Sequence, residues 1–565
     1  MRRFKSQLVL ASFLVVTAVG GANAQTQKLA DDLQQLLGQT LAPTDVIIQF
    51  KNPPSILDLA ALQLVGAVIK RTYTVIPAIA VTLPAPQLLG ILSLPNLLYI
   101  SPDRPLQPLL DISAPAINAP TAWQSGLDGT GIGIAVIDSG IAAHADLNTA
   151  SGSASRVVYS QSFVDSASGD PYGHGTHVAG IIGGNGHGSS GLYRGIAPNA
   201  SLVDLRVLDK NGASQDSIVI AAIDRAVQLK SKYNIRSINL SLGRPIFESY
   251  TADPLCQAVT AAWKQGIVVV ISAGNLGRNG YGTILAPANT PSAITVGVMK
   301  TMGTVTRADD LIASYSSRGP SLFDMVAKPD LVAPGNLEVS LLSPGSTLAM
   351  TYPQSIVGQS YLRLSGSSMA APAVSGAAAL MLQKTPGLSP DTIKARLMQS
   401  ATKQFPVSSI ATDDATGKTY TDYYDMFTVG SGYLDVAAAL SSTVNASGSA
   451  LSPTVIYSRV LGTASVVLPV GSIWGITTTA LNTVWGPVLV NGGTALWGST
   501  ALWGSTALWG STALWGSTAL WGSNGPSGTT ALWGSTALWG STGPSGSTAL
   551  WGSTALWGSS YAGEK

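Results

Sequence analysis

Five short apolar stretches dominate the middle of the chain, between about residues 130 and 440. They are rich in β-branched residues and read GIGIAVID, SLVDLRVL, IRSINLSL, IVVVISAG and AITVGVM. Helical patterns such as QDSIVIAAIDRAVQLKSKY lie between them. Strands that are apolar on both faces must be covered on both faces. The pattern therefore predicts a three-layer α/β fold, with a mostly parallel central sheet and helices on both sides.

The N-terminus has the features of a secretory signal peptide over residues 1–24. A basic start is followed by an apolar run and then by Ala22-Asn23-Ala24, an A-x-A cleavage site. The apolar run is too short for a membrane anchor, and no later span of 18 apolar residues follows. No cysteine follows the cleavage site, which excludes a lipid anchor there. We therefore expect a secreted protein without a transmembrane anchor, released or associated with the cell envelope.

Residues 45–106 alternate strand-like and helix-like patterns in the order βαββαβ, which predicts a small α+β module within a segment spanning 25–108. The stretch QPLLDISAPAINAPTA at 107–122 is rich in proline and alanine and is interpreted as a linker. A larger domain is expected over 109–442.

Composition argues against a nucleic-acid partner and against an intramolecular disulfide. The net charge is +2 and no Lys/Arg cluster follows the first residues, so nucleic acid is not an expected partner. The single cysteine, Cys256, cannot form an intramolecular disulfide. It lies in the amphipathic pattern DPLCQAVTAAWKQG, which favours a buried structural thiol over a reactive one.

The C-terminal region, 443–565, contains the low-complexity repeat STALWG. Its first tryptophans are six residues apart, and the GPSG-containing interruptions keep that register. An even period places every tryptophan on one face of an extended strand, so a β-solenoid or hairpin array is one interpretation. Low-complexity disorder is the other.

Four motifs at predicted strand ends or helix starts carry chemical groups. Asp138 ends the strand GIGIAVID, where parallel sheets place active sites, although a turn aspartate is the alternative. His174 lies in GHGTHVAG and is a candidate general base; His177 is more consistent with a structural histidine, and the H-E-x-x-H zinc pattern is absent. Asn275 follows a strand in SAGN and is a candidate oxyanion donor or a turn residue.

The fourth motif is SGSSMAAP at 365–372, which runs into an apolar helical pattern. A serine at the positive end of a helix is suited to a nucleophile, but an ordinary N-cap serine has the same sequence signature. The motifs occur in the order Asp, His, Ser, which is one of the known orders of the serine triad.

The chain resembles the subtilisin-like serine proteases, the subtilase family, over about residues 115–440. The resemblance rests on short blocks distributed along this region: VIDSGI at 136–141, GHGTHVAG at 173–180, SLG at 241–243, SAGN at 272–275, SSRGP at 316–320, KPDLVAPG at 328–335 and GSSMAAP at 366–372. The family block usually reads G-T-S-M-A, so Ser368 takes the place of the nucleophile and Ser367 that of the threonine.

The resemblance implies the remaining roles. Asp138 would orient the imidazole, His174 would act as general base, Asn275 would line the oxyanion hole, and Ser241, Leu242 and Gly243 would pair with the substrate backbone. No cofactor is required for such catalysis. Asp146, in AHADL, matches a position where many subtilases bind a structural calcium ion.

The resemblance also identifies the 45–106 module as a propeptide that inhibits the enzyme until it is cut off near 104–112. The function expected is that of a self-processing serine endopeptidase acting on proteins or peptides. The alternative is a surface or matrix adhesion protein, in which the tryptophan repeats contact the cell envelope or polysaccharide and the protease fold is a carrier.

Overall fold

The computed structural model describes residues 28–29, 33, 43–73, 77–102, 112–413, 417–458, 463–474 and 484. The chain divides into two compact units, Met1–Pro108 and Leu109–Lys565. The predicted signal peptide and the STALWG repeats lie outside the described residues.

The first unit contains one antiparallel sheet with the strand order β2-β3-β1-β4. Its elements follow the predicted βαββαβ order: β1 Pro43–Phe50, α3 Ile56–Leu64, β2 Val68–Thr72, β3 Ala78–Pro84, η1 Ala85–Ile91 and β4 Leu97–Pro102. The helix α3 begins with a capping box between Ser55 and Asp58. The second predicted helix is the 3₁₀ helix η1, because Pro86 at its start and Gly90 near its end disfavour a longer α-helix.

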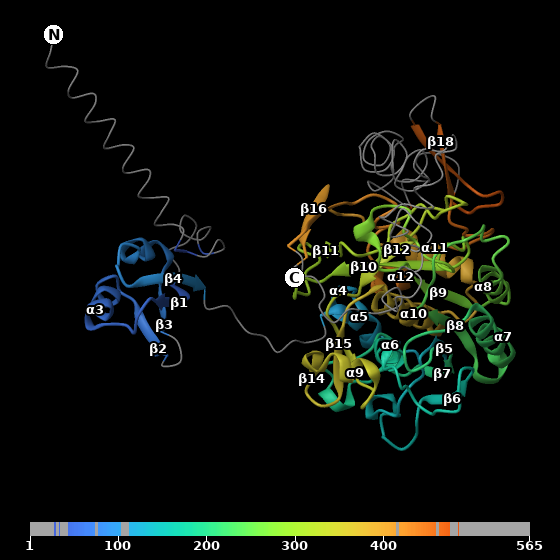
Figure 1. Ribbon diagram of the computed structural model, residues 1–565, viewed down its shortest axis with the longest axis horizontal. Helices are drawn as coiled ribbons and strands as arrows, with labels where there is room; N and C mark the ends of the chain where they lie inside the picture. Colours follow the sequence, from blue (N-terminus) through green and yellow to red (C-terminus); the bar gives the residue numbers. More distant parts are fainter. Residues whose placement is uncertain are drawn as a thin grey trace, which may run out of the picture. The chain divides into compact units, whose positions relative to one another are not determined.

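The second unit is built on an eight-stranded sheet with the order β11-β10-β9-β8-β5-β7-β6, in which β12 also pairs with β10 (Figure 1). All pairs are parallel except that of β10 with β11. The strands are β5 Gly133–Asp138, β6 Val157–Ser162, β7 Ser201–Arg206, β8 Ile235–Leu240, β9 Val268–Ser272, β10 Ile294–Lys300, β11 Leu311–Ile312 and β12 Leu331–Pro334. The five predicted strands are confirmed as β5, β7, β8, β9 and β10.

Helices cover the sheet as the apolar strands require. The helices α6 (His174–Gly183) and α10 (Ser367–Lys384) pack on each other and on the central strands. The helices α7 (Asp216–Tyr233) and α8 (Pro254–Lys264) pack together on another part of the sheet, at the right-hand side of Figure 1. In the part of the chain that the structure describes, no helix has both the length and the apolar character needed to cross a membrane.

Smaller elements complete the second unit: α4 Ser113–Ala116, α5 Ala119–Gln124, η2 Ala145–Leu147, η3 His187–Ser189, η4 Gly277–Asn279, β13 Glu338–Leu341, α9 Thr347–Thr351, η5 Pro353–Ser355, β14 Ile356–Val357, β15 Tyr361–Leu364, α11 Pro390–Ser400, β16 Ser408–Thr412, β17 Thr419–Tyr423, α12 Val436–Ser441, β18 Thr454–Ser458 and β19 Thr463–Val467.

The interpretation of 107–122 as a linker is wrong for its second half. Residues 113–124 form the short helices α4 and α5, whose side chains Ala114, Ile117 and Ala122 are buried in the core. Pro120 lies at the start of α5, where a missing N–H costs no hydrogen bond. The prolines therefore start helices here instead of breaking structure.

The packed unit also continues past the predicted boundary at residues 442 and 443. The amide of Ala327 donates to Pro453 O at 2.8 Å, and that of Val455 donates to Met325 O at 3.0 Å. The buried indole of Trp474 donates to Leu451 O at 2.7 Å. Residues 443–474 thus belong to the folded unit as far as they are described.

A buried cluster of charged side chains connects residues 443–474 to the rest of the second unit. The carboxylate of Asp330 contacts Lys328 Nζ at 2.7 Å and Lys394 Nζ at 3.0 Å. It also accepts a hydrogen bond from Ser452 Oγ at 2.5 Å. One carboxylate therefore joins β12, α11 and the segment after residue 442.

We expect Asp330→Asn to lower the free energy of unfolding by about 3–5 kcal/mol, because two buried lysines lose their shared counter-charge. Ser452→Ala should cost only about 1 kcal/mol. Urea unfolding measures both values, in a Ser368→Ala background that lacks the nucleophile expected from the sequence. Equal stability of Asp330→Asn and its parent would contradict this account of the cluster.

Candidate active site

A buried aspartate–histidine pair lies at the carboxyl end of the sheet. Asp138 is the last residue of β5, and His174 is the first residue of α6. Each residue is 1% exposed, and Nδ1 of His174 lies 2.7 Å from Oδ1 of Asp138. Because a carboxylate accepts, Nδ1 carries the hydrogen and Nε2 is the basic nitrogen.

The pair sets the protonation of the imidazole. Burial alone would lower the pKa of His174, but the charge and hydrogen bond of Asp138 reverse the shift, so the pKa lies above its ordinary value. A general base must be neutral to accept a proton. Activity that depends on His174 is therefore expected to fall as the pH drops below this raised pKa.

Asp170, which the sequence analysis did not single out, holds the two sides of this pair together. Its carboxylate accepts hydrogen bonds from the amides of Gly173 at 2.7 Å and Thr176 at 2.8 Å, on either side of His174. It also accepts from Ser139 Oγ at 2.7 Å, next to Asp138. The sequence feature that could have identified Asp170 is its position four residues before His174.

Ser368 lies in the first turn of α10, beside the segment that follows β8. Its Oγ donates to Ser241 O at 3.2 Å, and Ser241 Oγ donates to Ser368 O at 2.9 Å. The structure thus brings Ser368 to Ser241 and His174 to Asp138. Among the described residues, Nε2 of His174 has no hydrogen-bond partner, and rotation about the Cα–Cβ bond of Ser368 redirects Oγ without moving the backbone.

Asn275 follows β9 and is held in a fixed orientation. Its Oδ1 accepts from the amide of Ser367 at 2.8 Å and from Ser367 Oγ at 3.0 Å. The same hydroxyl accepts from Gly274 N at 3.0 Å. Since Oδ1 is engaged on this side, the donor nitrogen Nδ2 is directed away from Ser367. Ser367 is therefore a positioning residue, which its place in the motif alone did not establish.

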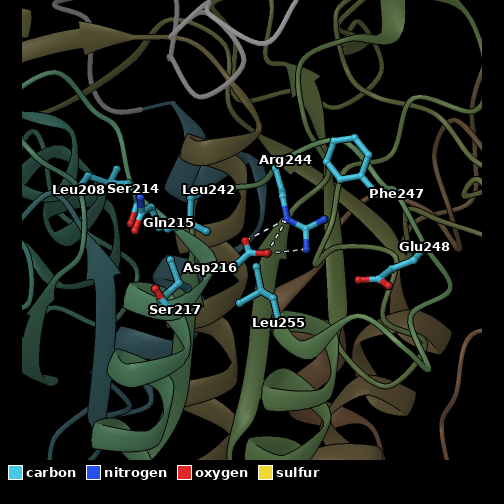
Figure 2. A pocket seen from close by; sticks show the side chains of 11 residues that line it. Leu208, Ser214, Gln215, Asp216, Ser217, Leu242, Arg244, Phe247, Glu248 and Leu255 are labelled. Atoms are coloured by element: carbon cyan, nitrogen blue, oxygen red, sulfur yellow. Dashed lines mark hydrogen bonds and ion pairs between the residues drawn. The ribbon is translucent and has the colours of Figure 1, made fainter. Parts of the chain in front are cut away.

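Leu242, in the segment Ser241–Gly243, lines a cavity of about 560 Å³. Figure 2 shows an ion pair between Arg244 and Asp216 and the ring of Phe247 beside the guanidinium. The guanidinium donates to the Asp216 carboxylate at 2.7–2.9 Å and to the buried Asp253 at 2.9 Å. The apolar part of the lining consists of Leu208, Val219, Leu242, Phe247 and Leu255. Of this lining, the sequence analysis identified only Leu242.

Two further sequence expectations are confirmed. His177 Nε2 lies 2.9 Å from Leu362 O and 3.2 Å from Glu338 O, and burial lowers its pKa to about 3, so it is a neutral structural residue. Cys256 is buried, and burial raises the pKa of its thiol to about 12. A thiol with that pKa is not a nucleophile at neutral pH.

The surroundings of Asp146 do not fit a calcium ion. Its carboxylate oxygens already accept hydrogen bonds from the amide of Gly188 at 2.7 Å and from the hydroxyl of Tyr361 at 2.9 Å. The guanidinium of Arg156 donates to the Asp146 carbonyl at 2.7 Å. Within the described ranges, no group of three or more His, Cys, Asp or Glu side chains is placed to hold a metal ion. A cation would have to displace these donors and face a buried positive charge.

A buried aspartate–histidine pair and a serine at the start of a neighbouring helix are the groups that serine-type endopeptidases use. A model of the subtilase family, peptidase S8, matches residues 129–422. The chain belongs to this family.

Two relatives, AprX and subtilisin DY, agree with that assignment. Serine protease AprX of Bacillus subtilis is 36% identical over 318 residues, which are 54% of this chain and 70% of the relative. Subtilisin DY of Bacillus licheniformis is 37% identical over 292 residues, 51% of this chain and 90% of the relative. The crystal structure of a cold adapted subtilisin-like serine proteinase is 30% identical, covers 55% of this chain and 90% of its own, and has a TM-score of 0.39.

Loss of the Ser367 hydroxyl should loosen the Asn275 amide, because only the hydrogen bond from the Ser367 backbone N–H then remains. We expect Ser367→Ala to lower kcat about tenfold with little change in KM, less than the 10²–10³-fold loss typical of deleting an oxyanion donor. Ser367→Thr, which keeps the hydroxyl, should retain most of the activity. Steady-state kinetics on a peptide p-nitroanilide measure both constants; an effect on KM alone would contradict the positioning role.

Removal of the Tyr361 hydroxyl, which donates a hydrogen bond to Asp146, should lower the stability of the fold. We expect Tyr361→Phe to lower the free energy of unfolding by about 1–3 kcal/mol, because a buried carboxylate oxygen loses its partner. EDTA should leave the Tm of the Ser368→Ala protein unchanged in a thermal scan. A Tm that falls in EDTA and returns with added calcium would show that a cation stabilises the fold after all.

Proposed function

We propose that this protein is a secreted endopeptidase that hydrolyses peptide bonds with Asp138, His174 and Ser368, through an acyl-enzyme. The observation that carries the proposal is the 2.7 Å contact between the buried Asp138 and His174, at the edge of the sheet where α10 presents Ser368. No cofactor enters the reaction.

The reaction proceeds in two halves. Ser368 Oγ attacks the carbonyl carbon of the scissile bond while Nε2 of His174 takes the hydroxyl proton. Asp138 stabilises the imidazolium and keeps its Nδ1 hydrogen in place. The imidazolium then protonates the leaving amine, and the C–N bond breaks to give the acyl-enzyme. Water, deprotonated by His174, attacks the ester carbon. The imidazolium returns this proton to Ser368 Oγ as the ester C–O bond breaks and the acid leaves.

The negative charge that develops on the carbonyl oxygen requires donors that are already in place. We assign this role to Nδ2 of Asn275 and the backbone N–H of Ser368. One such side-chain donor contributes about 3 kcal/mol of transition-state stabilisation. The two hydrogen bonds from Ser367 to Oδ1 support the assignment, because they fix the side chain before the substrate arrives.

The substrate lies as an extended strand along Ser241–Gly243. Main-chain hydrogen bonds of this kind bind many sequences, and pockets for alternate side chains add selectivity. The cavity lined by Leu242, Leu208 and Leu255 supports such a pocket for an apolar side chain. Its polar rim holds the carboxylates Asp216 and Glu248 as well as Arg244, which disfavours an acidic side chain.

The first unit acts as a propeptide that the enzyme removes itself and that inhibits it until then. Two observations support this role. The unit has its own core and ends at Pro108. It also exposes large apolar side chains, among them Ile56, Leu57, Leu64 and Val68, as expected of a module that binds a partner. Residues 1–24 direct export, and the STALWG repeats hold the enzyme at the cell envelope or a polysaccharide.

Self-processing tests the proposed function. The protein without residues 1–24 is produced as wild type and as Ser368→Ala, and intact mass gives the N-termini. We expect wild type to be cleaved between residues 104 and 112 and the variant to stay whole. Cleavage of the variant at the same position, or intact wild type, would contradict the proposal. Adding a trace of wild type to the variant distinguishes cleavage within one molecule from cleavage between molecules.

A further inference from the structure

Two neighbouring strand ends form facing walls beside Ser368. The strands β8 and β9 are parallel neighbours, with Leu240 paired to Ile271. The chain leaves β8 into 241–243 and leaves β9 into 273–275. Because the strands are adjacent, these two segments flank one gap at the carboxyl edge of the sheet.

The proposed function determines what must enter that gap, and the inference rests on it. The scissile carbonyl carbon lies at Ser368 Oγ, and its oxygen points to Asn275, at the end of the second wall. The backbone of the same substrate residue runs along 241–243, the first wall. Its side chain therefore projects between the two walls.

The segment Leu285–Ala286 forms the floor of the gap, and its backbone is hydrogen-bonded to both walls. The amide of Leu285 donates to Ala273 O at 3.3 Å, on the second wall. Ala286 and Arg244 exchange two backbone hydrogen bonds, of 2.7 and 2.8 Å, which tie the floor to the end of the first wall. The position of Leu285 is thus fixed by main-chain contacts on either side.

The side chain of Leu285 occupies the space between the walls. An atom at the Cβ position of Gly274 would lie 2.9 Å from both Cγ and Cδ1 of Leu285. An atom at the Cβ position of Gly243 would lie 3.1 Å from Cβ and 3.5 Å from Cδ1 of the same residue. Leu285 is 4% exposed. One isobutyl group therefore reaches both walls, and a side chain at Gly243 or Gly274 would crowd it.

We propose that Leu285 determines the specificity of this protease, by restricting the substrate residue that supplies the scissile carbonyl to small side chains such as glycine, alanine and serine. An aromatic ring at that residue would have to displace Leu285 from between its two pinned walls. Overpacking of this kind is unfavourable because close-packed side chains have little room to yield.

Matched substrates test the proposal in the processed enzyme. The pair succinyl-Ala-Ala-Pro-Ala-p-nitroanilide and succinyl-Ala-Ala-Pro-Phe-p-nitroanilide differs only in the residue that supplies the scissile carbonyl. We expect wild type to prefer alanine at least tenfold in kcat/KM, which is within the range that a few methylene groups provide. We expect Leu285→Gly to reduce this preference at least tenfold or to reverse it. The ratio of kcat/KM for the two substrates in Leu285→Ala should lie between those of wild type and Leu285→Gly.

Ile284→Ala is the matched control. Ile284 is the neighbouring buried residue, and it packs into the main hydrophobic core, to which Leu285 does not belong. We expect this variant to lose stability like Leu285→Gly and to keep the wild-type ratio of the two substrates. A change of ratio in Ile284→Ala equal to that of Leu285→Gly would overturn the proposal, since general loosening would then explain both.

These measurements distinguish failure of the Leu285 proposal from failure of the proposed function. Wild type that cleaves the phenylalanine substrate as well as or better than the alanine substrate overturns the role of Leu285 and leaves the protease assignment intact. Failure to hydrolyse either substrate or casein, in a processed and folded enzyme, overturns the proposed function itself. If Leu285→Gly does not fold, the wild-type ratio and Leu285→Ala decide the matter.

Discussion

Parallel pairing of β5, β8 and β9 is the constraint on which the site depends. Because the three strands are adjacent and point the same way, Asp138, Ser241 and Asn275 emerge at one edge of the sheet. The helices α6 and α10 pack against each other and on these strands, and their first turns carry His174 and Ser368 to the same edge. No single residue has to be placed by a long loop, so the geometry of catalysis follows from the geometry of the sheet.

Hydrogen bonds from small polar groups then hold the proposed catalytic residues at that edge. Asp170 ties the start of α6 to the residue after β5, and Ser367 ties the start of α10 to the loop after β9. Each link joins two different elements, so each converts the packing of helix on sheet into a fixed orientation of a functional side chain. Buried polar groups that are satisfied in this way rigidify a site, and a preorganised site stabilises charge without rearranging.

The sequence was sufficient for five strands of the central sheet and for the motifs at their ends, because apolar β-branched runs and short glycine-rich blocks are local signals. It was misleading where packing decides. Pro120 suggested a linker, but its helix packs Ala119 and Ala122 into the core. The strand β6 escaped notice because alternate residues are exposed. Asp146 matched a calcium position by motif, while Tyr361, which engages its carboxylate, lies 215 residues away in sequence. Leu285 likewise becomes informative only when Gly243 and Gly274 are brought to either side of it.

The proposed peptide-bond hydrolysis depends on one serine, Ser368, that is activated by one histidine, His174. The most direct test is to react the processed enzyme with a fluorophosphonate probe and to map the modified residue by peptide mass spectrometry. We predict a single adduct on Ser368, formed at a rate that falls by several orders of magnitude in His174→Ala. An adduct on another serine, or equal labelling of Ser368 in the His174→Ala protein, would contradict the account.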